Sequence, residues 1–206
     1  MVKIKICGLK EEEDVKFLND FPLDYMGFIM YPKSPRYVND KLKELLSLVK
    51  KAKKVAVFVN PSYEEVKKAL DLGADFIQLH GEETPQFGKK IGLKKVIKAF
   101  KVKDNTFDFK ELSFWGNAYA ILIDTYVKGI PGGTGKTFNW DIAKKIVSLG
   151  YKVFLAGGIN PDNVLSAMTK VFPYAIDIAS GVELYPGKKD PEKIIKLFNN
   201  LKMISC

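Results

Sequence analysis

The feature that most constrains the fold is an alternation of short β-rich runs with lysine-rich amphipathic segments along the whole chain of 206 residues. Runs rich in Val, Ile or Phe predict strands. They cover residues 2–7, 25–30, 55–60, 75–80, 95–100, 118–124, 152–157 and 174–180. Capping residues beside prolines mark helix starts between them, as at Asn160-Pro161 and Asp190-Pro191. The connection 101–117 is weaker and predicts a short or irregular helix.

Successive βα units of this kind predict a parallel sheet with right-handed crossovers. Eight of them close naturally into a (β/α)₈ barrel, which we expect to form one domain over residues 1–206. A doubly wound open sheet is the alternative. In a barrel, the chemistry lies at the carboxyl ends of the strands. The order of strands therefore predicts where the functional side chains meet.

Cysteine usage and hydropathy predict the cellular setting. The chain has 2 cysteines, Cys7 and the last residue, Cys206, so a disulfide framework is not expected. The first residues lack the apolar core of a signal peptide, and no run approaches the roughly 20 apolar residues of a membrane span. We expect a cytoplasmic protein without membrane association.

The net charge of +9 raises a nucleic-acid-binding protein as an alternative of a different class. Such a protein would gather arginines and aromatic residues on one face. Here lysines recur at helical spacing beside glutamates, which is typical of solvated helix faces, and Arg36 is the only arginine. A guanidinium binds a carboxylate or phosphate through two parallel hydrogen bonds, which an ammonium cannot do. Arg36 is therefore predicted to bind a carboxylate or phosphate or to stack on an aromatic ring, and nucleic acid is not expected as a partner.

The predicted strand ends bring a thiol, a guanidinium, an imidazole and a carboxylate to one rim. Cys7 ends the first strand and Arg36 lies in the loop after the second. His80 ends the fourth strand and Asp124 the sixth. The barrel topology therefore predicts that these four side chains share one site.

Glycine-containing turns follow the last two predicted strands. Gly157 and Gly158 lie at the end of the seventh strand, and Ser180 and Gly181 at the end of the eighth. In barrels these two loops commonly bind phosphate through backbone N–H groups. They predict a phosphorylated small-molecule substrate.

The run GIPGGTGKT, residues 129–137, predicts a loop that closes over this ligand, with Gly133 as a binding residue. It is not a P-loop, because Ile130 stands where that motif needs glycine. One histidine and one non-terminal cysteine provide no zinc-type ligand cluster, while a carboxylate-only magnesium site stays open.

Several blocks carry a resemblance to a known family. They are KICGL (5–9), GFIMYPKSPRYV (27–38), VAVFVN (55–60), QLHG (78–81), LIDT (122–125), GGTGKTFNW (132–140), AGGINPDNV (156–164) and DIASGVE with GKKD (177–190). With these blocks the chain resembles the phosphoribosylanthranilate isomerases, small (β/α)₈ barrels of tryptophan biosynthesis. Asn139 and Ala179 depart from the family pattern, where aspartate and serine are common.

The resemblance implies an Amadori rearrangement of N-(5-phosphoribosyl)anthranilate to 1-(2-carboxyphenylamino)-1-deoxyribulose 5-phosphate. It implies Cys7 as general base, Asp124 as general acid, Arg36 as the ligand of the anthranilate carboxylate, and no cofactor. A thiolate base needs a pKa lowered toward neutrality, and an aspartic acid that donates a proton needs a raised one. For His80, lining the pocket and a structural role are both left open.

Strand periodicity adds one hypothesis. Residues 5 and 7 of a strand face the same way, so Lys5 enters the barrel if Cys7 does, and a buried ammonium needs a partner. Asp177 on the neighbouring eighth strand is the first candidate partner, and Asp124 is the second. In a Lys5–Asp177 pair below Cys7, the ammonium would help to favour the Cys7 thiolate.

Other phosphate-binding barrels are the enzymatic alternative. An indole-glycerol-phosphate synthase would call for lysine and glutamate at strand ends, and many epimerases for paired histidines. Oligomeric state is left open, with a homodimer as one option.

Overall fold

The computed structural model describes residues 2–102, 107–124 and 140–202. Its strands are Lys3–Cys7 (β1), Tyr25–Ile29 (β2), Lys53–Phe58 (β3), Phe76–Leu79 (β4), Val96–Lys101 (β5), Ala120–Asp124 (β6), Val153–Ala156 (β7) and Ala175–Ile178 (β8). Each pairs in parallel with the next, and β8 pairs with β1, which closes the barrel. The predicted (β/α)₈ fold is confirmed, and each strand lies within about two residues of its predicted bounds at either end.

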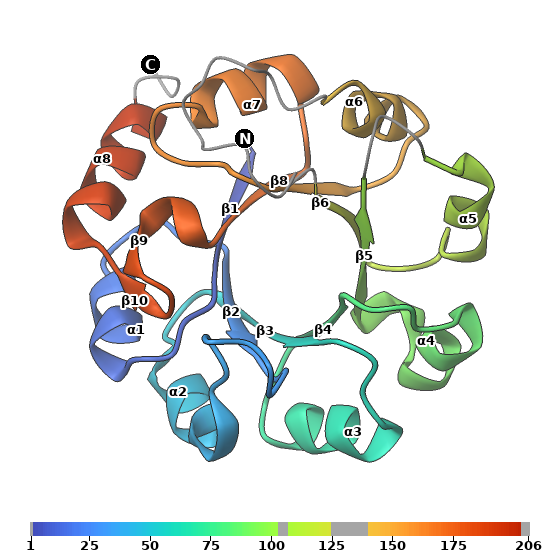
Figure 1. Cartoon of the computed structure of the whole chain (residues 1–206), viewed down its shortest axis with the longest axis horizontal. Coiled ribbons are helices and arrows are strands. Elements are labelled where there is room, and N and C mark those ends of the chain that lie inside the picture. Colours follow the sequence, from blue (N-terminus) through green and yellow to red (C-terminus); the bar gives the residue numbers. More distant parts are fainter. Residues whose placement is uncertain (1, 103–106, 125–139, 203–206) are drawn as a thin grey trace.

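The α-helices form a ring around the barrel (Figure 1). They are Glu12–Leu18 (α1), Leu42–Leu48 (α2), Tyr63–Asp71 (α3), Pro85–Ile91 (α4), Phe109–Phe114 (α5), Asp141–Ser148 (α6), Val164–Val171 (α7) and Pro191–Lys202 (α8). Three single turns of 3₁₀-helix, Asn39–Lys41 (η1), Leu93–Lys95 (η2) and Ser180–Val182 (η3), and a short hairpin, Glu183–Tyr185 (β9) and Lys188–Lys189 (β10), complete the elements.

Helix starts follow local capping chemistry. At α3, the Ser62 hydroxyl accepts from the Glu65 N–H and the Glu65 carboxylate accepts from the Ser62 N–H, a complete capping box. Helix α8 begins at Pro191, as predicted. The prediction at Asn160-Pro161 was wrong, because α7 begins at Val164. Asn160 instead accepts side-chain hydrogen bonds from the N–H groups of Asp162 and Asn163, which hold a turn before the helix. The short α5 fits the weak pattern of 101–117.

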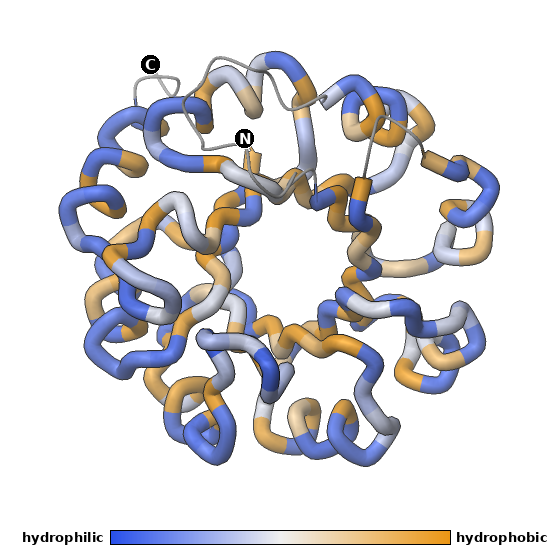
Figure 2. Tube along the Cα trace, in the orientation of Figure 1, coloured by the Kyte–Doolittle hydropathy of each residue, from blue (hydrophilic) through white to orange (hydrophobic). Residues whose placement is uncertain are grey.

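Two apolar layers account for the packing. The larger one lies between strands and helices, where residues such as Ile6, Phe28 and Leu155 are fully buried. A smaller one fills the barrel and includes Cys7 and Phe154. Figure 2 shows the outcome of this patterning, with apolar strands at the centre and helices that carry hydrophilic residues on their outer sides.

No helix within the described residues is both long and apolar enough to span a lipid bilayer.

Candidate active site

The candidate residues that the structure describes lie at the carboxyl ends of the strands or in the loops after them. Cys7 ends β1 and Asp124 ends β6, while Arg36 lies between β2 and α2. Gly157 and Gly158 follow β7, and Ser180 and Gly181 open the single turn η3 after β8. Gly133 and the rest of run 129–137 lie outside the described residues. The barrel therefore gathers these candidates at one rim, as its topology requires.

Cys7 is 6% exposed and lies above the Lys5–Asp177 pair inside the barrel. The Lys5 ammonium lies 2.9 Å from both carboxylate oxygens of Asp177, and Lys5 is completely buried. Lys5 and Asp177 are also direct neighbours in the β1–β8 register. Of the two partners proposed for Lys5, the structure selects Asp177.

Gly27 provides the space for this arrangement. It pairs with Cys7 in the β1–β2 register. A Cβ atom at Gly27 would lie 2.7 Å from the Cys7 Sγ atom and 3.1 Å from the Lys5 Nζ atom. The first distance is shorter than real side chains show and the second is tight, so any residue with a Cβ atom would displace the Cys7 thiol. Gly27 had no predicted role, although a glycine inside a strand signals a close approach of this kind.

Burial raises the pKa of the Cys7 thiol. The Lys5 ammonium opposes this effect and Asp177 adds to it, with Lys189 contributing a smaller lowering. The prediction of a pKa lowered toward neutrality was wrong, because desolvation in the barrel outweighs the nearby cations. Burial by itself lowers the pKa of Lys5, but Asp177 and Cys7 outweigh it, so Lys5 stays charged and its pKa is raised.

Asp124 and His80 contact each other across the ends of β6 and β4. The His80 Nε2 atom lies 3.4 Å from the Asp124 Oδ2 atom. On the other side of the ring, the Gln78 amide nitrogen lies 3.0 Å from the His80 Nδ1 atom. This contact holds the imidazole ring so that its Nε2 atom faces the Asp124 carboxylate. His80 therefore lines the site next to Asp124.

Arg36 meets a carboxylate that the sequence did not reveal. Its Nε and Nη2 atoms donate to Glu183 at 2.9 and 2.6 Å. Glu183, 6% exposed, has a pKa that burial would raise, but the bond from Arg36 and the charge of Lys189 outweigh burial and lower it. The stem of Arg36 crosses Gly8, whose added Cβ would lie 2.6 Å from the Arg36 Cδ atom. Gly8 has φ +78°, so both its conformation and the close approach require glycine.

The loops after β7 and β8 are packed against each other. A Cβ atom at Gly181 would collide with the carbonyl oxygen of Ile159. Gly157 and Gly158 have φ +97° and +64°, which turns the chain sharply after β7. Within the described residues, the N–H groups of Gly157, Gly158, Ser180 and Gly181 donate to no protein acceptor. Such groups in adjacent turns can bind the oxygens of a phosphate.

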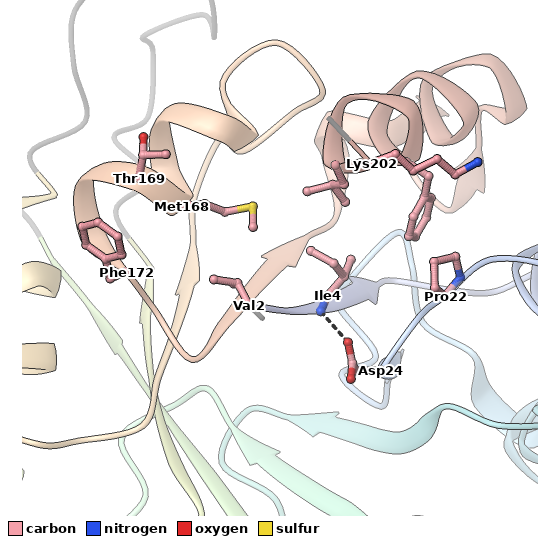
Figure 3. Close-up of a pocket in the computed structure, with 10 residues that line it drawn as sticks. Val2, Ile4, Pro22, Asp24, Met168, Thr169, Phe172 and Lys202 are labelled. Atoms are coloured by element: carbon pink, nitrogen blue, oxygen red, sulfur yellow. Dashed lines mark hydrogen bonds between the residues drawn. The ribbon is translucent and has the colours of Figure 1, made fainter. Parts of the chain in front are cut away.

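Two of the cavities among the described residues differ in their relation to the site. One of 940 Å³ opens beside His80 and is also lined by Asn60, Lys98 and Trp115. The other, 420 Å³, lies at the opposite end of the barrel, where β1 and β2 begin, and is lined mostly by apolar residues such as Val2, Met168 and Phe172 (Figure 3). None of the candidate site residues lines this second cavity, so it is separate from the predicted site. Among the residues described, no three His, Cys, Asp or Glu side chains group as metal ligands.

Comparison with known proteins connects this geometry to a family. Residues 4–200 match the family model described as N-(5'phosphoribosyl)anthranilate (PRA) isomerase. The chain belongs to this family. It is therefore an isomerase of N-(5'-phosphoribosyl)anthranilate in tryptophan biosynthesis, and the function predicted from its sequence is confirmed.

Relatives match over almost the whole chain. The N-(5'-phosphoribosyl)anthranilate isomerase of Aquifex aeolicus is 50% identical over 205 residues, which are 98% of this chain and 99% of that one. A crystal structure of the Thermotoga maritima enzyme matches with a TM-score of 0.85, at 36% identity, over 98% of this chain and 100% of its own. A second structure from that organism, of monomers generated from the dimeric enzyme, gives 0.81 at 33% identity, over 98% and 99%.

A further isomerase structure contains reduced 1-(o-carboxyphenylamino)-1-deoxyribulose 5-phosphate. It matches with a TM-score of 0.82 at 33% identity, over 98% of this chain and 100% of that one. That relative thus binds an analogue with both a carboxylate and a phosphate, the two groups for which this rim has candidate binding residues.

Proposed function

We propose that the isomerisation runs on Cys7 as general base and Asp124 as general acid at the rim of the barrel. The observation that carries this assignment is the position of Cys7, which is buried above an ion pair at the end of β1. Asp124 ends β6, the strand that lies on another side of the barrel (Figure 1). A substrate bound between the two would meet an acid and a base from different directions.

Up to the enolamine, the reaction requires one proton transfer from the acid and one to the base. Asp124 gives a proton to the ribose ring oxygen as the bond from this oxygen to C1 breaks, which leaves a positively charged imine at C1. The Cys7 thiolate then takes the proton at C2, and the freed electron pair forms the C1–C2 double bond of an enolamine. Protonation at C1 and loss of the C2 hydroxyl proton give the ketone. The imine is the electron sink, so these residues need no cofactor.

The raised pKa of Cys7 fits this scheme if one proton is shared by the acid–base pair. The reactive form has a thiolate and a protonated Asp124. The form with that proton on sulfur instead contains the same number of protons, so the ratio of the two forms does not change with pH. Burial of the thiol therefore lowers the reactive fraction without requiring an alkaline optimum.

Arg36 and the two glycine turns would hold the ends of the substrate. Arg36 donates to the anthranilate carboxylate, while Gly157, Gly158, Ser180 and Gly181 donate backbone N–H groups to the phosphate. Gly133 is proposed to contribute to phosphate binding from its loop. Anchoring both ends of the substrate positions C1 and C2 between the acid and the base.

The experiment follows the fluorescence of freshly generated phosphoribosylanthranilate and identifies the product by mass and periodate sensitivity. We expect rapid decay with the wild-type chain and a loss of about 10²–10⁴-fold with either Cys7→Ala or Asp124→Asn. The double variant should lose far less than the product of the two losses, because one missing proton transfer already blocks the reaction. Full activity in either single variant would refute that residue's role.

We further propose that the chain forms a homodimer and works in the cytoplasm. The dimeric Thermotoga maritima relative supports the first part, and the scarcity of cysteines supports the second. Sedimentation at micromolar concentration tests the dimer. Fractionation of the source cells tests the compartment.

A further inference from the structure

A buried hydrogen-bond network connects Arg36 to the end of β1, which carries Cys7, and to the start of the loop after β8, which carries Ser180 and Gly181. It consists of Arg36, Glu183 and Lys189 with the main-chain carbonyl groups of Cys7 and Ala179. Neither Glu183 nor Lys189 received a role from the sequence or from the proposed mechanism. Both belong to the β9–β10 hairpin, which is an addition to the eight βα units.

Lys189 is the centre of this network. Its ammonium donates to the Cys7 carbonyl at 2.6 Å, to the Glu183 Oε1 atom at 3.0 Å and to the Ala179 carbonyl at 3.3 Å. An ammonium has three N–H bonds, so all of them are used. The side chain is 1% exposed. Lys189 thus holds three groups in fixed positions relative to one another. They are the end of β1, the main chain of Ala179 and the Glu183 carboxylate.

Glu183 occupies one edge of the Arg36 guanidinium. Its two oxygens accept from Nε and Nη2, which form the side edge of the group. A guanidinium has five N–H bonds, and its outer edge, made of Nη1 and Nη2, presents one parallel pair. Among the described residues no acceptor lies on that pair, so it can bind a second carboxylate. A lysine could not serve two carboxylates in this way.

We propose that Glu183 and Lys189 are positioning residues for the isomerisation. Glu183 turns the outer edge of Arg36 toward the anthranilate carboxylate, and Lys189 ties Glu183 to the main chain of Cys7 and Ala179. The charges of Arg36, Glu183 and Lys189 sum to one positive charge, which matches one carboxylate of the substrate. This inference rests on the proposed role of Arg36.

Glu183→Gln separates orientation from charge. The variant keeps the size of the side chain but has one oxygen in place of two, so it cannot accept both hydrogen bonds from Arg36. It also removes one negative charge, which raises the net charge of the network by one. Attraction by charge alone would tighten binding of a carboxylate. Loss of orientation weakens it.

The measurement is calorimetric affinity for two ligands. One is reduced 1-(o-carboxyphenylamino)-1-deoxyribulose 5-phosphate, and the other is the same compound made from aniline, which lacks the carboxylate. For Glu183→Gln and for Lys189→Met we expect about tenfold weaker binding of the first ligand and less than twofold change for the second. Tighter binding of the first ligand, or equal changes for both, would overturn the proposal.

Lys188→Met is the matched control. It makes the same charge change one residue away on β10, but Lys188 donates to Asp14 and Glu13 on α1 instead of to the network. Both ligands should bind to it as to the wild type. Arg36→Met tests the proposed function separately, because equal losses for both ligands there would show that Arg36 does not bind the carboxylate.

A structure of the wild-type chain with the first ligand decides the matter if a variant fails to fold. We expect Arg36 to keep both bonds to Glu183 while the ligand carboxylate lies on Nη1 and Nη2. Release of Glu183 by Arg36 on binding would contradict the positioning role.

Discussion

The Lys5 ammonium lies 2.9 Å from both oxygens of Asp177, fully buried beneath the Cys7 thiol. The two members of this pair act on Cys7 in opposite directions. Lys5 lowers the pKa of the thiol and Asp177 raises it, while burial is the largest influence. The basicity of the proposed base is therefore set by a balance within the barrel, and each member can be varied.

Asp177→Asn should lower the pKa of Cys7, and Lys5→Met should raise it. A thiolate that forms more easily enlarges the reactive fraction, so kcat/KM should rise or hold in Asp177→Asn and fall in Lys5→Met. The alkaline limb of the pH profile reports loss of the proton shared by the acid–base pair. It should therefore shift to lower pH in Asp177→Asn and to higher pH in Lys5→Met. Rates of iodoacetamide alkylation against pH, in a Cys206→Ser background, measure the thiol directly. Shifts in the same direction for both variants would contradict this account.

The wild-type pH profile follows from the raised pKa of Cys7. Below that pKa the pair holds its proton, and the ratio of the reactive form to the form with the proton on sulfur is constant. We expect kcat/KM to stay flat through neutral pH and to fall only above the ordinary thiol range, beyond about pH 8.5. A fall that begins near pH 7 would mean that the site lowers the pKa of Cys7.

His80→Asn should impair the acid more than it impairs binding. The His80 Nε2 atom lies 3.4 Å from the Asp124 carboxylate, and removal of the ring takes away one of the groups that fix the orientation of this carboxylate. We expect kcat to fall about tenfold with KM changed less than threefold. A large rise in KM with unchanged kcat would instead assign His80 to substrate binding.

Gly181→Ala should weaken phosphate binding, because its new Cβ would push the loop after β8 away from Ile159. We expect KM for the substrate and the inhibition constant of inorganic phosphate to rise about tenfold or more. Gly150→Ala is the control. It has φ +87° but nothing within 4 Å of its Cβ position, so it should cost stability and leave both constants unchanged.

Lys98 and Glu83 form a structural pair under the loop that carries His80. Their charged atoms lie 2.7 Å apart, and Glu83 also accepts from the N–H groups of Asn60 and Gly81. Lys98→Met leaves a buried carboxylate without its cation, so we expect a loss of about 3–5 kcal/mol in the free energy of unfolding. Urea denaturation of Lys98→Met and of the double variant with Glu83→Gln measures the effect, and the double variant should recover part of the loss. An unchanged midpoint for Lys98→Met would show that water reaches this pair.

The sequence predicted the parts of this molecule that depend on local pattern. Runs rich in Val, Ile or Phe predicted the strands, and capping residues predicted helices between them. The barrel topology then placed Cys7 and Asp124 at one rim. The alternation of side chains along β1 predicted that Lys5 enters the barrel and left Asp177 and Asp124 as its candidate partners, with Asp177 first because β8 is the neighbour of β1 once the barrel closes.

Contacts between distant loops could not be predicted in the same way. Arg36 and Glu183 are 147 positions apart, and neither strand period nor spacing relates a loop after β2 to a hairpin after β8. The pKa of Cys7 was mispredicted for a related reason, because the balance of burial against charge depends on packing in three dimensions. Gly27 is different, since its place inside a predicted strand was a usable sign.

The most direct test of the central claim compares the two cysteines of the chain. Cys7→Ser and Cys206→Ser are assayed at equal concentration by decay of phosphoribosylanthranilate fluorescence, with circular dichroism as the check of folding. The account predicts a loss in kcat/KM of at least about 10²-fold for Cys7→Ser and no change for Cys206→Ser. Wild-type activity in a folded Cys7→Ser variant would contradict it, since the isomerase would then take the C2 proton with another group.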